Sequence, residues 1–335
     1  MTLRADIVQR PSPATADRGA VVVVVYGRDD DLPACIDSLN THLPPGVAIV
    51  VVDNASPRPL APALATRFPN VHVLRARENG GYAGGNNIGA DYALSLGAPL
   101  LYFLNDDTVV TAGFWEACEE TLADPTTAVA GSILVHFTRP TVMQIAGWTL
   151  DRETLCEGFR GVEETWDESF AGRWSCDAVF GAAFMMRGPV FAALGGFDER
   201  FFHLSEELDL CLRSQAAGHG VCYAGSSLVL HKGGASLSHA APRYAYYLFR
   251  NRLWLWRRHV RRAVFLRRAP QRIGRMLLEQ WRGRSWLRRD LVTLWATLRG
   301  CAAGFLAPCA PVPYPFGSRE PRIQSINTAA ADRSS

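Results

Sequence analysis

The 335-residue sequence lacks cysteines grouped at the spacing that holds a metal ion or a local disulfide. Its eight cysteines are scattered along the chain, and no two of them form a C-x-x-C motif. Structural zinc sites and disulfide frameworks depend on such grouped cysteines. Their absence argues against both and favours a reducing compartment such as the cytosol. With 48% hydrophobic and 20% charged residues, the composition is typical of a globular protein.

Segments that would target the chain to a membrane or anchor it there are also lacking. Residues 1–20 contain charges and prolines but no apolar core of a signal peptide. The most apolar late stretch, residues 291–307, is interrupted by Arg299, Gly300 and Gly304, and it is too short for a membrane-spanning helix. We therefore expect a cytoplasmic protein that is either free or peripheral on the inner face of the membrane.

Acidic residues are scarce in the C-terminal part of the chain. Residues 243–299 contain sixteen arginines and two carboxylates, a net charge of +14, whereas residues 1–242 carry −12. Aromatic residues and arginines are interleaved over residues 244–258, where the pattern predicts a helix. Such a helix either lies on an anionic membrane surface or packs its aromatic residues on the rest of the protein. We expect no nucleic-acid partner, because the acidic body would repel a phosphate backbone.

Short apolar runs alternate with helical patterns over the first hundred residues. The runs at residues 20–26, 47–52, 71–74 and 100–104 are typical of buried strands in a parallel sheet with crossover helices. Polar residues follow three of these runs, so ligand-binding groups would gather at one edge of the sheet. No G-x-G-x-x-G follows the first run, which argues against a dinucleotide-binding Rossmann fold.

Composition divides the chain into four parts. Residues 1–19 are rich in proline, alanine and aspartate, and we expect them to be disordered. Residues 20–240 are expected to form the α/β domain, and residues 241–305 a helical extension rich in arginine and aromatic residues. Residues 306–335 are rich in proline and are expected to form a flexible tail.

The strand predicted at residues 100–104 leads directly into Asn105, Asp106 and Asp107. Carboxylate and amide oxygens are hard ligands that suit Mg²⁺ or Mn²⁺, and such an ion is often shared with substrate phosphates. A solvated Asn-Asp turn would give the same local sequence. These three residues alone do not distinguish a metal site from a turn.

Seven segments between residues 20 and 240 together resemble the inverting glycosyltransferases of family 2. In chain order they are the valine-rich strand that ends at Tyr26, Val51–Ser56 (VVDNAS), Glu78–Asn87 (ENGGYAGGNN), Leu104–Thr108 (LNDDT), Gly195–Glu199 (GGFDE), Glu206–Arg213 (EELDLCLR) and His231–Ser236 (HKGGAS). Each segment alone is weak, but seven in the family's order are specific. The resemblance implies the GT-A fold, an α/β fold with a mostly parallel nucleotide-binding sheet flanked by helices. Among family branches, the bacterial rhamnosyltransferase-like enzymes of glycan synthesis are the most similar.

The resemblance also implies a role for each matching residue. Asp107 occupies the metal-binding position of the family's aspartate motif, and His231 the position of a second metal ligand, so Mn²⁺ or Mg²⁺ is the implied cofactor. By its sequence context alone, His231 would sooner be a strand-end histidine bonded to a carbonyl. Asp53 is the implied partner of the nucleobase or ribose. The complete implied nucleotide-sugar site consists of Tyr26, Asp53, Asn79, Gly80, Gly81, Tyr82, Asn86 and Asp106.

The general base implied by the family is the second acid of the pair before the DLCLR helix, which is Glu207 here. The family favours Asp at this place, so Glu206 and Asp209 stay open as alternatives. Asp209 and Arg213 are four residues apart, which favours a structural ion pair on one helix face. A second departure is Gly27, where relatives often carry a larger polar residue, and this puts a donor contact from that position in doubt.

The function implied is metal-dependent, inverting transfer of a sugar from a nucleoside-diphosphate donor to a hydroxyl. The favoured donor is dTDP-rhamnose, followed by UDP- and GDP-sugars, and the acceptor is a glycan, a lipid-linked glycan or a natural product. One alternative is a non-catalytic scaffold that binds a nucleotide sugar or a membrane. A sugar-phosphate nucleotidyltransferase fits less well, because the first strand is followed by one arginine and three acids rather than a basic glycine-rich loop.

Overall fold

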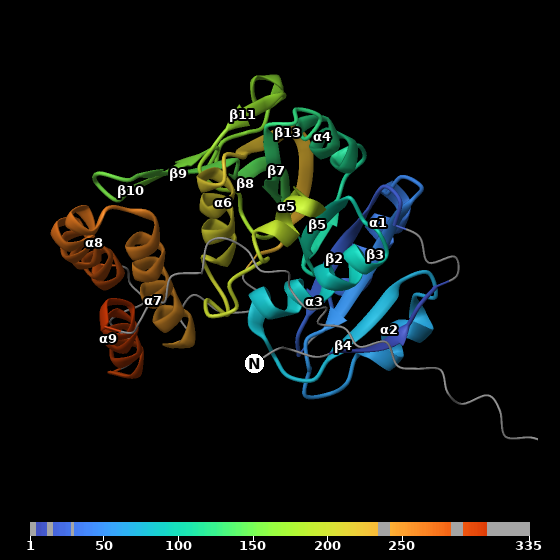
Figure 1. Ribbon diagram of the computed structural model, residues 1–335, viewed down its shortest axis with the longest axis horizontal. Helices are drawn as coiled ribbons and strands as arrows, with labels where there is room; N and C mark the ends of the chain where they lie inside the picture. The colour runs from blue at the N-terminus through green and yellow to red at the C-terminus, as the bar shows by residue number, and fades with distance from the viewer. Residues whose placement is uncertain (1–4, 12–15, 28–29, 234–241, 283–290, 307–335) are drawn as a thin grey trace, which may run out of the picture.

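A computed structural model describes residues 5–11, 16–27, 30–233, 242–282 and 291–306. These residues form an α/β domain and, on one side of it, a group of three C-terminal helices (Figure 1). The tail predicted from residue 306 onward lies outside the described residues, apart from Leu306.

The main sheet of the α/β domain is mixed and has eleven strands. Its order is β1 (Ala5–Gln9), β4 (His72–Ala76), β3 (Val47–Asp53), β2 (Gly19–Val25), β5 (Leu100–Asn105), β12 (Ala183–Arg187), β7 (Thr127–His136), β13 (Gly220–His231) and β11 (Arg173–Ser175). Two further strands are attached to it, β6 (Thr108–Val110) on β13 and β8 (Arg139–Ile145) on β7. The strands β4, β3, β2, β5, β7 and β13 run in one direction. The expectation of a mostly parallel sheet is therefore confirmed.

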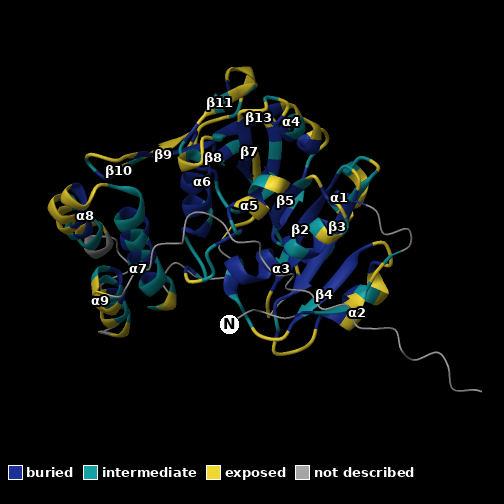
Figure 2. Cartoon of the chain, in the orientation of Figure 1, coloured by how far each residue is buried: buried dark blue, intermediate teal, exposed yellow. Residues whose placement is uncertain are grey.

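Six helices cover the two faces of this sheet. They are α1 (Leu32–His42), α2 (Ala61–Arg67), α3 (Gly81–Ser95), α4 (Phe114–Thr121), α5 (Gly188–Ala193) and α6 (Glu206–Ala216). Side chains alternate along each strand, so Val22 packs into one core with α3, α5 and α6, while Val21 and Val23 pack into another with α1, α2 and α4. The buried strands between these helices stand out in Figure 2.

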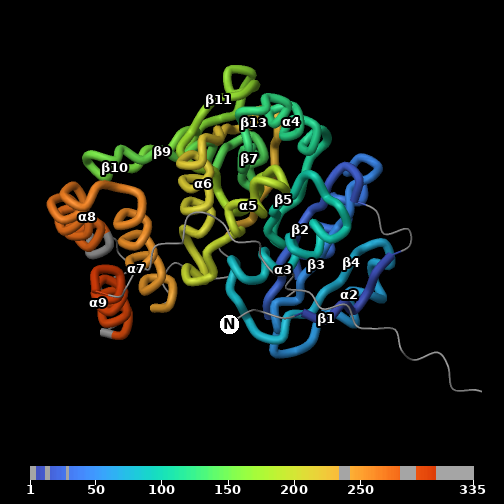
Figure 3. Tube along the Cα trace, in the orientation of Figure 1, coloured from blue at the N-terminus to red at the C-terminus, as the bar shows by residue number. Residues whose placement is uncertain are grey.

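A two-stranded hairpin, β9 (Gly147–Asp151) and β10 (Cys156–Arg160), extends from the domain toward the C-terminal helices (Figure 3). A short 3₁₀ helix, Glu168–Phe170, follows it. The ion pair between Glu157 of β10 and Arg252, 2.9 Å apart, joins the hairpin to the extension.

The prediction that residues 1–19 are disordered is wrong for Ala5–Gln9, which form β1. This strand pairs antiparallel with β4 at the edge of the sheet, and the Gln9 side chain donates to the carbonyls of Phe68 and Val71 at 2.8 and 2.7 Å. Its order comes from hydrogen-bonding groups that β4 offers, which the composition of the N-terminal residues does not reveal.

The C-terminal extension consists of α7 (Pro242–His259), α8 (Arg262–Arg282) and α9 (Leu291–Leu306). Phe249, Leu253 and Trp256 of α7 are buried in the same core as the sheet and α6, so of the two alternatives left open by the sequence, packing on the protein is found for α7. A Cβ atom at Gly300 or Gly304 of α9 would collide with α7, and glycine therefore permits the close contact of these two helices. None of the described helices has the length and apolarity needed to cross a membrane.

Candidate active site

A cleft of about 350 Å³ opens where β2, β3 and β5 end, at the carboxyl edge of the parallel strands. This is the edge at which open α/β sheets place their ligands. The cleft is lined by Val24, Tyr26, Gly27, Asn54, Asn79, Gly81, Tyr82, Asn105, Asp106, Phe202, His203, Arg243 and Tyr247. Five of the implied nucleotide-sugar residues thus share one cavity: Tyr26, Asn79, Gly81, Tyr82 and Asp106.

Asn54 organises the loop that forms one wall of the cleft. Its amide nitrogen donates to Asn79 Oδ1 at 3.1 Å and to the Gly81 carbonyl at 2.9 Å, and its oxygen accepts from the Gly80 backbone at 3.2 Å. Gly81 has φ +66°, and a Cβ there would overlap the Phe202 carbonyl oxygen. The glycine is therefore required by close contact with the loop before α6. Gly80 does not line the cavity itself. It supports the wall through the hydrogen bond that its backbone N–H donates to Asn54.

Tyr82 links the cleft to the acid pair. Its hydroxyl donates to the Gly181 carbonyl, and its ring meets Phe197 edge-on with centroids 5.7 Å apart. Burial, followed by the nearby Glu207 and Glu206 charges, raises the pKa of Tyr82 well above its usual value. The hydroxyl therefore stays neutral and acts as a hydrogen-bond donor.

Asp53 does not lie where a contact with the nucleobase or ribose would place it. Its carboxylate is fully buried and accepts from the backbone N–H groups of Ser56 at 2.9 Å, Leu60 at 3.0 Å and Ala61 at 3.3 Å, and it pairs with Arg75. These bonds fix the start of α2 and leave the carboxylate outside the cleft lining. The neighbouring Asn54 faces the cavity instead. A ligand contact by Asp53 has no support in this geometry and stays a prediction.

Asn86 also lies away from the cavity. It is buried on α3, and its amide nitrogen donates to the Tyr82 carbonyl of the same helix at 3.0 Å. The next residue, Asn87, exchanges hydrogen bonds of 2.9 Å with the backbone of Phe197. Asn87 therefore holds α3 against the segment around Phe197, whereas the bond of Asn86 stays within α3. A contact between Asn86 and the donor stays a prediction.

Asp107 and His231 come together beside the cleft, as the sequence resemblance implies. Asp107 Oδ1 is buried, has no hydrogen-bond partner in the described part of the chain, and lies 3.4 Å from His231 Nε2. Burial acts to raise the pKa of Asp107, but the His231 ring and the backbone N–H groups of Asp107 and Gly233 outweigh it and keep this pKa below its usual value. The carboxylate is thus charged and has a free oxygen, as a metal ligand must be.

Gln144 orients the His231 ring from outside. Its side-chain nitrogen donates to the His231 carbonyl at 2.8 Å, so its oxygen, 2.7 Å from Nδ1, must accept the Nδ1 proton. The other ring nitrogen, Nε2, is thereby directed toward Asp107. An outer partner of this kind is typical of metal-binding histidines.

The residues present fit a hard divalent cation that is shared with substrate. No group of three or more His, Cys, Asp or Glu side chains able to hold a metal occurs among the residues that the structure describes. Two protein ligands, with the remaining positions left to water and phosphate oxygens, match the way Mg²⁺ and its analogues are bound in phosphate-handling enzymes.

Glu206 and Glu207 begin α6, and both carboxyls are perturbed. Glu206 is buried and its Oε2 has no hydrogen-bond partner among the described residues, and burial followed by the Glu207 charge raises its pKa well above the usual value. Burial also raises the pKa of Glu207, against backbone N–H groups that include that of Gly181, and against the charge of Arg252. Glu207 is the more exposed of the two, and Gly181 connects it to Tyr82 at the cleft.

Asp209, the third candidate base, has its carboxylate bound by three side chains. It is completely buried, and it binds Arg213 at 2.7 Å, Arg258 at 2.9 Å and His259 at 2.8 Å. Burial opposes its charge, but Arg213 and the two partners on α7 hold its pKa far below the usual value. The predicted ion pair with Arg213 is confirmed. With both oxygens bound by these partners and no exposure to solvent, Asp209 is not available to accept a proton from a substrate.

Several residues of the site escape sequence reasoning. Asn54 belongs to the Val51–Ser56 segment, where the family resemblance assigns a role to its neighbour Asp53 and none to Asn54. Gln144 belongs to no recognisable motif. Its contact with His231 can be recognised only in the folded structure, where Gln144 of β8 lies beside the end of β13. Arg243 and Tyr247 come from the C-terminal extension, whose aromatic and basic pattern gave no indication of a cleft wall.

Comparison with known proteins agrees with this geometry. Residues 20–176 match the family model described as Glycosyl transferase family 2. Nearly half of the chain is therefore similar to family 2 glycosyltransferases. The O-antigen biosynthesis protein RfbC of Myxococcus xanthus is 29% identical over 247 residues, which cover 68% of this chain and 18% of that protein. The low-salt glycan biosynthesis hexosyltransferase Agl10 of Haloferax volcanii is 24% identical over 239 residues, covering 70% of this chain and 73% of that protein.

A solved structure supports the same fold. The mannosyltransferase PcManGT of Pyrobaculum calidifontis, in complex with GDP-Man and Mn²⁺, superposes with a TM-score of 0.53 at 16% identity, covering 89% of this chain and 77% of that one. The α/β domain thus has the GT-A fold that the sequence motifs imply. The chain spans less than a fifth of the length of the Myxococcus xanthus protein, so the two share one region of a much longer protein.

Proposed function

We propose that the protein is a metal-dependent inverting glycosyltransferase that moves a sugar from a nucleoside diphosphate to a hydroxyl acceptor. The observation that carries the proposal is the Asp107 and His231 pair, with its orphaned buried carboxylate oxygen, beside a cleft at the carboxyl edge of the sheet. The family 2 domain and the hexosyltransferase relative support the same activity.

Each group in the site has a task in this reaction. Asn79, Gly81 and Tyr82 line the cleft and would bind the nucleotide, while Asp107 and His231 would hold the cation. The cation, when bound, neutralises the charge of the leaving diphosphate. Glu207 accepts the proton of the acceptor hydroxyl as the new bond forms. The hydroxyl attacks from the side opposite the diphosphate, which inverts the anomeric carbon.

The donor and acceptor follow from weaker support. The motifs resemble rhamnosyltransferases, which favours dTDP-rhamnose, whereas the structural neighbour binds GDP-Man, so UDP- and GDP-sugars rank next. The relative named for O-antigen biosynthesis favours a glycan acceptor, free or lipid-linked. A lipid-linked acceptor would also give a use to the arginine-rich α8 and the exposed apolar residues of α9, Val292, Trp295 and Leu298.

The test is a thermal-shift panel of dTDP, UDP, GDP and their sugars, each with and without Mn²⁺ or Mg²⁺, followed by turnover of the donor that binds. We expect metal-dependent stabilisation by one nucleotide, its loss in Asp107→Asn, and loss of turnover without loss of binding in Glu207→Gln. Glu206→Gln serves as the matched control and should keep turnover. Metal-independent binding would contradict the role of Asp107, and nucleotide binding without any turnover would favour the scaffold alternative.

A further inference from the structure

The loop that leads into α6, residues 200–205, has an uncommon backbone. Phe202, Leu204 and Ser205 have φ values of +64°, +73° and +70°, a left-handed conformation that residues other than glycine seldom adopt. Such strain persists only where surrounding contacts hold it, and it concentrates at functional sites. The contacts that hold this α6 entry loop therefore indicate what the molecule requires of it.

Two adjacent residues of α7 hold the α6 entry loop through its carbonyl groups. Asn251, a fully buried residue, donates through its amide nitrogen to the carbonyls of Phe201, His203 and Leu204 at 3.0, 2.8 and 2.7 Å. Arg250 donates to the carbonyls of Arg200 and Phe201 at 2.9 and 2.8 Å, and to Asn251 Oδ1 at 2.7 Å. Four of the first five carbonyls of the loop thus depend on these two side chains.

The other side of the α6 entry loop faces the candidate active site. Phe202 and His203 line the cleft, and the Phe202 carbonyl lies against Gly81 and accepts from the Ala83 backbone at 3.4 Å. The Phe202 ring stacks on Tyr247 of α7 with centroids 5.4 Å apart. The loop is followed directly by Glu206 and Glu207, the first two residues of α6. Its conformation therefore fixes both one wall of the cleft and the position of the acid pair.

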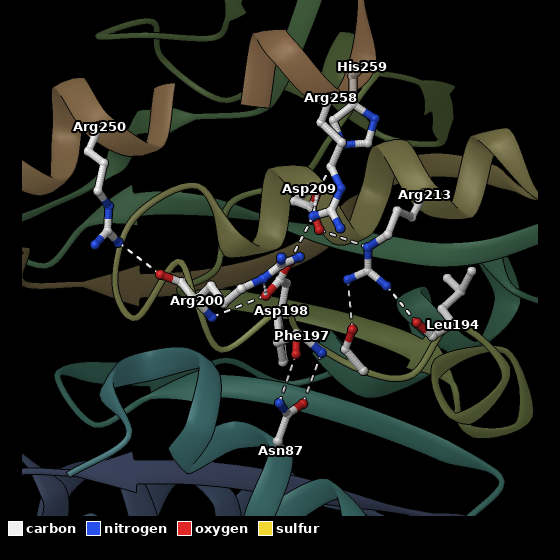
Figure 4. Close-up of polar contacts among 11 residues, drawn as sticks. Asn87, Leu194, Phe197, Asp198, Arg200, Asp209, Arg213, Arg250, Arg258 and His259 are labelled. Atoms are coloured by element: carbon white, nitrogen blue, oxygen red, sulfur yellow. Dashed lines mark hydrogen bonds and ion pairs between the residues drawn. The ribbon is translucent and has the colours of Figure 1, made fainter. Parts of the chain in front are cut away.

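A second set of contacts holds α6 from the far end of α7 (Figure 4). Arg258 and His259 bind the buried Asp209 in the first turn of α6, and Arg258 also binds Asp198 at 2.9 Å. Figure 4 shows Arg250 reaching the Arg200 backbone on one side and Arg258 with His259 above Asp209 on the other. The start of α6, which carries Glu206 and Glu207, is thus held by contacts from both ends of α7.

We infer that Asn251, assisted by Arg250, is a positioning residue of the transferase: it keeps the α6 entry loop in its strained conformation, so that Glu207 is aimed at the acceptor and Phe202 closes the cleft. This inference rests on the proposed function, because it assigns α7 the task of presenting the proposed base. It makes the C-terminal extension a working part of the active site rather than an appendage.

The test uses the full-length protein with Asn251→Leu, which keeps the side-chain size but removes the amide. Turnover is measured as nucleoside diphosphate released from whichever of dTDP-rhamnose, UDP-glucose or GDP-mannose the wild type consumes with Mn²⁺. We expect kcat to fall about a hundredfold, as a misplacement of about 1 Å at a reacting group does, with a much smaller change in donor KM. We also expect a displaced acid limb of the kcat–pH profile and faster amide exchange at residues 200–207.

Two further variants keep the outcome decisive if Asn251→Leu folds poorly. Arg250→Ala removes two carbonyl contacts from a partly exposed position and should lower kcat in the same way, and Arg250→Lys should recover part of the loss. Arg257→Ala is the matched control, because the Arg257 side chain donates to the Gly304 carbonyl of α9 at 2.9 Å. Its kcat and pH profile should match the wild type.

The results separate failure of this inference from failure of the proposed function. If Glu207→Gln is inactive while the Asn251 and Arg250 variants keep the wild-type kcat and pH profile per folded molecule, Asn251 has only a structural role and the positioning inference is wrong. If Glu207→Gln itself turns over at the wild-type rate, the proposed base is wrong, and the positioning inference fails with it.

Discussion

At the scale of single residues, the acid pair at the start of α6 combines two carboxyls whose environments differ. Glu206 is sealed in the protein, and its charge is opposed by burial and by Glu207. Glu207 is partly exposed, and Arg252 on α7 favours its charged form. A general base must be deprotonated to work, so activity should be lost as the pH falls through the raised pKa of Glu207. The acid limb of the activity profile should therefore lie above about 4.3, the value of an ordinary Glu.

Arg252→Met tests this assignment by a shift in pH alone. Removing the cation withdraws an interaction that lowers the pKa of Glu207, so this pKa should rise and the acid limb should move to higher pH. The plateau rate at high pH should stay close to wild type. The measurement is kcat/KM against pH. Arg261→Met, which breaks the exposed pair of Arg261 with Glu153, is the control and should leave the profile unchanged. An unmoved acid limb in Arg252→Met would show that the titrating base is not Glu207.

The residues that could be predicted are those whose position follows from strand order. Asp106 and Asp107 follow β5, and His231 ends β13, so a parallel sheet brings them to one edge without further information. The tasks of Asn54 and Asn251 could not be predicted, because each binds carbonyls that lie about 25 and 50 residues away in the chain. Asp53 shows the reverse limit: a motif position alone does not reveal that the carboxylate is bound by Arg75 and by backbone N–H groups of the segment that follows it.

At the scale of secondary-structure elements, α6 and α7 are joined by a buried charge cluster. Asp209 on α6 is opposed by Arg213 on the same helix and by Arg258 and His259 on α7. Buried ion pairs add little net stability over apolar packing, but removing one partner leaves the others buried without compensation. The docking of α7 therefore depends in part on the Asp209 carboxylate.

Asp209→Asn should lower the free energy of unfolding by about 3–5 kcal/mol, the cost of breaking a buried pair. Because the folded pKa of Asp209 is lowered, its contribution is present above the pKa of the unfolded group and is lost as the pH falls through the folded pKa. The difference between variant and wild type should therefore be full at neutral pH and shrink in acid. Urea unfolding at several pH values measures it. The exposed-pair variant Arg173→Met should change stability by no more than about 1 kcal/mol.

The elements themselves were largely predictable from hydrophobic pattern, with two instructive failures. β1 forms although its residues look unstructured, because an existing sheet edge supplies its partners. Residues 221–224 and 227–230 have separate strand patterns, interrupted at Gly225 and Ser226, yet they form the single strand β13 with an irregularity between Ala224 and Leu228. In both cases the deciding interactions come from a neighbouring strand rather than from the segment.

At the scale of the whole molecule, the boundary between the acidic and basic parts of the sequence differs from the boundary between structural parts. The sequence separates an acidic body from a basic extension. In the structure α7 belongs to the body: it is buried in its core, and its Arg243 and Tyr247 line the cleft. Only α8 and α9 have mainly exposed outer sides (Figure 2). If any part of the extension meets a membrane, it is these two helices.

The exposed surface of α8 and α9 combines the two features that bind anionic membranes. Trp295 is 63% exposed and Val292 57%, and Arg262, Arg267 and Arg275 of α8 are exposed as well. Apolar side chains enter the interface while arginines attract anionic headgroups. We expect the full-length protein to co-sediment with vesicles that contain phosphatidylglycerol, to bind pure phosphatidylcholine vesicles much less, and to dissociate as salt is raised.

Trp295→Ser should weaken this vesicle binding without lowering turnover of a soluble donor, because Trp295 lies outside the cleft. Phe159→Ser is the matched control, since Phe159 is similarly exposed, at 52%, but lies on the β10 hairpin. Equal loss of binding in both variants would mean that exposed aromatic residues act without regard to position, and the assignment to α9 would be wrong. Selective loss in Trp295→Ser would place the membrane side of the protein on α9, with α7 between that surface and the candidate active-site cleft.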